Sequence, residues 1–96
     1  MADIAVEARR SLDGWLADVR VRVDGRATRH AVRVSEEAWQ RLTGGHVPVE
    51  ELVRASIEFL LAREPPEAIL QAFEVNVIPR YFPEYERTMR ARFGAA

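Results

Sequence analysis

The side chains that usually carry out catalysis are scarce in this sequence. It has two histidines, His30 and His46, no cysteine and no lysine, since all fourteen basic residues are arginines. This excludes thiolate nucleophiles, Schiff-base chemistry and the lysine of a phosphate-binding loop. Glu50 follows His46 by four residues, but a zinc site needs three or four ligands. We therefore predict no catalytic, metal-binding or cofactor-binding residue, no small-molecule substrate, and a protein that is not an enzyme.

The arginines are the residues that could still form a functional surface. The formal net charge is −1, so overall charge alone does not attract a polyanion. The charge is uneven along the chain. Residues 1–34 hold seven arginines and five acids, residues 35–76 hold three arginines and eight glutamates, and residues 77–96 hold four arginines and two glutamates. An acidic middle therefore separates two mildly basic ends.

Four of the seven arginines of residues 1–34 lie in a predicted β-hairpin, residues 21–34. Asp24-Gly25 is typical of a type I′ turn, in which both central residues have positive φ. This turn places Val19 opposite His30 on an apolar face, and we expect His30 to be buried and hydrogen-bonded. Arg29 and Arg33 then lie on the opposite, solvated face.

A second Asp-Gly pair, Asp13-Gly14, predicts that the preceding segment folds back in the same way. Ile4 then lies opposite Val23 on the apolar face, and Arg9 opposite Asp18 on the solvated face. Two turns that agree on one apolar face predict a three-stranded antiparallel meander. Its strands are expected at about residues 3–11, 15–23 and 27–34.

The rest of the chain has the signals of helices. Ser35 followed by two glutamates is a typical helix start, and Pro65-Pro66 ends the longest apolar helical pattern. Residues 75–82 read as a short aromatic-rich turn or helix. We predict a single α+β domain, residues 1–96, whose meander is packed on one face by helices. The expected helices are a short one at 35–43, a long central one at 48–63, and short C-terminal ones at 67–73 and 84–93.

Residues 30–64, a strand, a short helix, a turn and a longer helix, also resemble the ribbon-helix-helix proteins. The resemblance implies a DNA-binding regulator or antitoxin, in which one strand from each of two subunits enters the major groove. Arg29 and Arg33 would then contact DNA. The alternative is a solvated sheet face, on which acidic residues neutralise some of the arginines.

The C-terminal half carries a second resemblance. The pattern F-L-L-x-R-E-P, then I-L-x-x-F, then V-I-x-x-Y-F-P-E-Y, spans Phe59 to Tyr85. It resembles a family of small uncharacterised prokaryotic proteins, which brings no assigned activity. The aromatic residues either close the core or form an interface, where tyrosine and arginine are favoured. The candidate partner-binding residues are Tyr81, Tyr85, Arg87 and Arg90.

The function that these patterns favour is protein interaction. No basic segment leads into an apolar run at the N-terminus, and no apolar run approaches the roughly 20 residues of a membrane span. We therefore expect a small cytoplasmic bacterial protein with an accessory or regulatory role. Its expected partner is another protein, with homodimerisation, and nucleic acid is the alternative partner.

Overall fold

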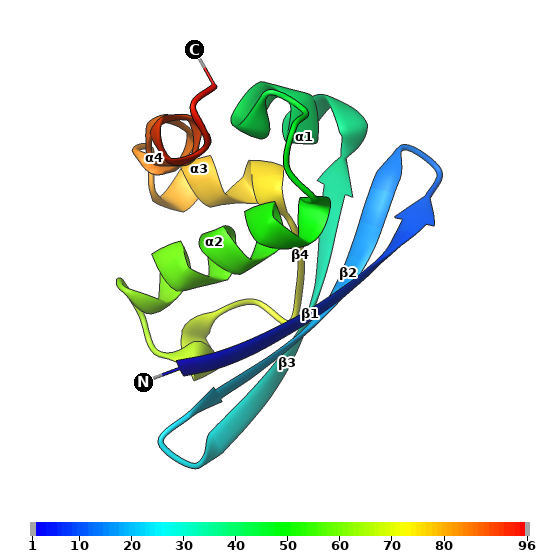
Figure 1. Ribbon diagram of the computed structural model, residues 1–96. Helices are drawn as coiled ribbons and strands as arrows, with labels where there is room; N and C mark the ends of the chain where they lie inside the picture. The colour runs from blue at the N-terminus through cyan, green and yellow to red at the C-terminus, as the bar shows by residue number, and fades with distance from the viewer. Residues whose placement is uncertain (1, 96) are drawn as a thin grey trace.

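The computed structural model describes residues 2–95, and it places a four-stranded sheet beneath a layer of helices (Figure 1). The strand order is β1-β2-β3-β4. The first three strands form an antiparallel meander, and the short fourth strand runs parallel to β3. The strands are β1 (Ala2–Ser11), β2 (Gly14–Val23), β3 (Arg26–Ser35) and β4 (Ala72–Glu74).

All helices of the described residues lie on one face of this sheet, so its other face is uncovered (Figure 1). The predicted α+β class, with a meander packed on one face, is confirmed. The α-helices are α1 (Glu36–Thr43), α2 (Val49–Leu61), α3 (Ile78–Tyr81) and α4 (Tyr85–Phe93), and the 3-10 turns are η1 (Pro66–Ala68) and η2 (Val75–Val77).

The β2–β3 hairpin has the predicted turn and register. Asp24 and Gly25 have φ values of 51° and 79°, as a type I′ turn requires. Val19 lies opposite His30, and Val21 opposite Thr28. The apolar face of the hairpin therefore meets the helices as expected.

The β1–β2 register differs from the prediction by two residues. Ser11 pairs with Gly14, so Leu12 and Asp13 form the turn and Ile4 lies opposite Val21 instead of Val23. Gly14 has no positive φ; it is needed because a Cβ there would lie 2.8 Å from the amide nitrogen of Glu36. A shift of two residues keeps every side chain on its predicted face.

The predicted helix at 67–73 is wrong. Only one 3-10 turn forms, and the chain then runs extended beside β3. The reason is that β3 offers free backbone groups along this edge: the amide of Ala31 donates to the carbonyl of Gln71 over 2.7 Å. Pairing with β3, which is distant in sequence, is therefore favoured over the helix that the local pattern predicts.

The core lies between the sheet and α2, which occupies most of the predicted range 48–63. Leu52, Val53 and Ile57 on α2 are fully buried, as are four valines of β2 and β3, namely Val19, Val21, Val32 and Val34. Arg41 connects α1 to the C-terminal segment, because its guanidinium donates to Asn76 over 2.7 Å and to Glu86 over 3.0 Å. These contacts fix the segment that forms the candidate site.

Candidate functional site

An apolar cleft opens where the end of α2 meets the segment from residue 68 to α3. Its volume is about 360 Å³. Leu70 and Tyr81 stand on its rim with 51% and 67% of their surfaces exposed. Among the described residues only Leu12, at the β1–β2 turn, is another large apolar side chain as exposed as these. The cleft is lined by Leu60, Glu64, Ala68, Ile69, Leu70, Phe73, Val77, Ile78, Tyr81 and Phe82.

The C-terminal sequence pattern and this cleft coincide. Nine of the ten lining residues are fixed letters of the F-L-L-x-R-E-P, I-L-x-x-F and V-I-x-x-Y-F-P-E-Y pattern, and only Ala68 is not. Segments from three separate parts of the chain therefore meet at one surface. Several other residues of the pattern hold the walls of the cleft in place.

The wall of the cleft at the end of α2 is held by a cluster around Arg63. The Arg63 guanidinium lies 3.5 Å from the centre of the Phe59 ring and pairs with Glu84 over 3.2 Å. Phe59 meets Phe82 edge to face, with ring centres 5.9 Å apart. The pKa of Glu84 is lowered mainly by a hydrogen bond with its own backbone and, to a smaller degree, by the hydrogen bond with Arg63. The cluster joins the end of α2 to the start of α4.

The opposite wall of the cleft is held by His30. The imidazole is 4% exposed, and its Nδ1 lies 2.8 Å from the carbonyl oxygen of Leu70. A carbonyl can only accept, so Nδ1 donates to Leu70, while Nε2 lies within hydrogen-bond distance of the Thr28 hydroxyl, at 2.9 Å. His30 is thus buried and hydrogen-bonded as predicted, and it fixes the backbone that presents Leu70.

The structure separates the four predicted partner-binding residues. Tyr81 is exposed on the rim of the cleft and Arg87 is exposed on α4, while Arg90 is half-buried. Tyr85 does not reach the surface: it is fully buried, and its hydroxyl lies 2.7 Å from that of Ser56. Burial raises the pKa of Tyr85 above its ordinary value. Its assignment as a partner contact is therefore wrong, because it faces α2 in the core.

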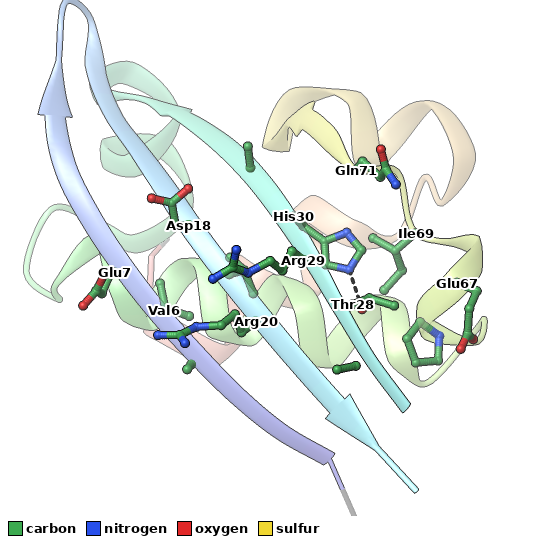
Figure 2. Close-up of a pocket in the computed structure, with 15 residues that line it drawn as sticks. Val6, Glu7, Asp18, Arg20, Thr28, Arg29, His30, Glu67, Ile69 and Gln71 are labelled. Atoms are coloured by element: carbon green, nitrogen blue, oxygen red, sulfur yellow. Dashed lines mark hydrogen bonds between the residues drawn. The ribbon is translucent and has the colours of Figure 1, made fainter. Parts of the chain in front are cut away.

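The uncovered face of the sheet is the second candidate surface. It holds a broad hollow of about 950 Å³, in which Arg20 and Arg29 project from β2 and β3 (Figure 2). These two arginines lie directly opposite each other. Arg9 pairs with Asp18 over 3.1 Å across the β1–β2 pair. Four other arginines on β2 and β3 form no ion pair within residues 2–95, namely Arg20, Arg22, Arg29 and Arg33.

The ribbon of a ribbon-helix-helix protein needs a strand edge that is free to pair with a second subunit. β3 pairs with β2 along one edge and with β4 along the other, so its Ala31–Arg33 stretch has neighbours on both sides. Arg29 and Arg33 are nevertheless exposed on the uncovered face. They remain candidates for binding through the face of the sheet.

The cleft and the uncovered sheet face are both candidate binding surfaces. Within residues 2–95 no group of three or more histidine, aspartate or glutamate side chains is placed to hold a metal ion. None of the helices described there has the length and apolar character of a membrane span. No protein-family model, curated protein or solved structure matches the chain.

Proposed function

We propose that the protein is a small non-enzymatic interaction module of bacterial origin that works in the cytoplasm in an accessory or regulatory role and as a homodimer. The cleft beside Leu70 and Tyr81 is the observation that supports this proposal. Its floor is formed by buried apolar side chains, while two large apolar side chains on its rim face solvent. Exposed apolar surface around a formed pocket is typical of a protein-binding site.

The lining of the cleft indicates the chemistry of its partner. The space suits one large apolar side chain, because the walls are leucine, isoleucine, valine and aromatic residues. Glu64 is the one charged residue in the lining, and its carboxylate has no ion-pair partner among residues 2–95. A partner segment that carries leucine, methionine or phenylalanine beside a lysine or arginine satisfies both features.

Selection from a random-peptide display library tests this proposal. We expect the wild type to enrich peptides with a large apolar residue next to a basic one, and Leu70→Asp to lose them at least tenfold, because a carboxylate on the rim is desolvated on binding. Glu64→Lys should instead enrich peptides with an acidic neighbour. Leu12→Asp is the matched control, since it places the same charge at an exposed leucine outside the cleft.

The selection also has clear contradicting outcomes. Enrichment that survives Leu70→Asp would place binding elsewhere on the molecule. Enrichment without any apolar consensus would show that the cleft is not the binding surface.

The second candidate function is nucleic-acid binding through the uncovered face of the sheet. Arg20 and Arg29 oppose each other with like charges, an arrangement that a phosphate backbone would relieve. Among residues 2–95 no aromatic side chain of the sheet lies on this face to stack on a base, and Trp15 packs against Trp39 on the helix side. The observation therefore supports contact with phosphates more than recognition of bases.

The double variant Arg29→Ala/Arg33→Ala separates these two functions. For an interaction module we expect no tight DNA binding by the wild type, and a change in stability within about 0.5 kcal/mol per residue, since both side chains are solvated. Mobility shifts at low and moderate salt, with thermal unfolding, measure both. Binding by the wild type that the double variant loses, with a weaker salt dependence, would favour nucleic acid.

A further inference from the structure

The two edge strands of the sheet differ greatly in length. β4 closes one edge with only three residues. β1 forms the other edge with ten residues, Ala2–Ser11, and no proline or lysine interrupts it. A long, regular edge strand presents unpaired backbone groups to another strand, and natural proteins usually shorten, charge or cover it.

The hairpin turn shows which backbone groups of β1 face outward. Residues that flank a two-residue turn form a hydrogen-bonded pair, so Ser11 and the other odd-numbered residues direct their backbone groups to β2. The even-numbered residues Ile4, Val6 and Ala8 then direct theirs away from the sheet. The structure agrees at one of them: Arg54 on α2 donates to the carbonyl of Ile4 over 2.6 Å.

The side chains of β1 are complementary to a second, antiparallel copy of the same strand. A twofold axis through Val6 places Asp3 opposite Arg9 of the second copy, twice over. On the helix side the same register places Ile4 opposite Ala8 and Val6 opposite Val6, all apolar. Moving the axis to Ala5 would oppose Asp3 to Glu7, and moving it to Glu7 would oppose the two Glu7 carboxylates, which destabilises a strand pair.

We propose that β1 pairs with β1 of a second copy in this register, so that two sheets join into one of eight strands. The inference rests on the homodimer of the proposed function and names its surface, which is separate from the cleft. Val6 exchanges two hydrogen bonds across the axis, and Ile4 exchanges two with Ala8 of the second copy on either side. Arg54 can keep its contact, because the Ile4 carbonyl has two acceptor sites.

Charge reversal tests the register in sedimentation velocity. We expect the wild type to dimerise, and Asp3→Arg and Arg9→Asp each to weaken the dimer at least tenfold, because each places like charges opposite each other twice. An equimolar mixture of the two variants should restore it, since both pairs are then opposite in charge. Arg29→Asp is the control, because it reverses a charge on the same face two strands away from the edge.

A cross-linking experiment locates the axis, because the chain has no cysteine of its own. Val6→Cys should form a covalent dimer on oxidation, since directly paired strand residues lie within disulfide reach at about 5.5 Å between Cα atoms. Ala5→Cys should not, because the register sets Ala5 opposite Glu7 of the second copy.

The outcomes distinguish the inference from the proposed function. A dimer that persists in Asp3→Arg and Arg9→Asp, with no recovery specific to their mixture, overturns pairing through β1 and leaves the homodimer in place. A wild type that stays monomeric overturns both. Peptide binding by the Asp3→Arg protein should be unchanged, because Asp3 lies outside the cleft; its loss would show that the cleft does not bind the peptide independently of β1.

Discussion

Replacement of Gly14 with alanine should destabilise the fold by about 3 kcal/mol or more, because the added methyl group has no space. A Cβ at this position would lie 2.8 Å from the Glu36 nitrogen and closer still to the Val34 carbonyl oxygen. Both neighbours are backbone atoms, so neither can turn away. Glu36 is also held by its amide, which donates to the Asp13 carbonyl over 2.7 Å. Urea unfolding measures the loss.

Gly25→Ala is the control for this prediction. Gly25 has a φ of 79°, but a Cβ there meets nothing within 4 Å. The cost is then only that of a left-handed residue with a side chain, roughly 1–2 kcal/mol. Equal losses in the two variants would show that Gly14 serves backbone freedom, as the sequence pattern suggested, and not close packing.

Replacement of Tyr85 with alanine should cost about 3–5 kcal/mol, because it removes a fully buried aromatic ring from the centre of the helical layer. The ring meets Phe59 edge to face, with centres 5.3 Å apart. Tyr85→Phe should cost only about 1 kcal/mol, the value of one hydrogen bond, because the Ser56 hydroxyl still donates to the Leu52 carbonyl. Thermal unfolding of both variants measures this difference.

A matched variant on the same segment is Tyr81→Ala. Since Tyr81 is two-thirds exposed, its removal should leave stability nearly unchanged and reduce peptide binding at the cleft. Similar stability losses at positions 81 and 85 would contradict the assignment of one tyrosine to the surface and the other to the core.

The two Asp-Gly pairs show how far the fold could be predicted from the sequence. Both lie at hairpin turns, and the faces that follow from them are correct. In the second hairpin Asp24 and Gly25 are the turn residues, whereas in the first hairpin the glycine belongs to the strand. The close approach of residues 34–36 decides this, and it is a tertiary contact that no local pattern contains.

The fourth strand could not be predicted for a similar reason. Residues 69–73 have two apolar residues followed by a third at a helix-like spacing, and the competing pairing with β3 depends on residues about forty positions earlier. His30 illustrates both what a local pattern predicts and what only a contact distant in sequence decides. Its burial followed from the hairpin register, but its hydrogen bond to Leu70 required the position of a segment that the sequence reads as helix.

The candidate site was predicted only in part. Tyr81 is on the rim of the cleft, while Leu70 and Glu64 were missed because they join it from other segments of the chain. The signal that could have found them is the C-terminal pattern itself, in which Glu64, Leu70 and Tyr81 are all fixed letters. Tyr85 lies in the same segment of this pattern as Tyr81. Only the packing of α4 on α2 distinguishes the core tyrosine from the surface one.

The central claim is that the cleft beside Leu70 and Tyr81 receives an apolar side chain of a partner protein. In its most direct test, the labelled protein is titrated with a display-selected peptide, and the amide and methyl chemical shifts are measured at each step. We predict that the shift changes centre on Leu60, Leu70 and Ile78 and spare Arg20 and Arg29 on the uncovered sheet face. Changes centred on the sheet face or on β1, with the cleft signals unmoved, would contradict the account.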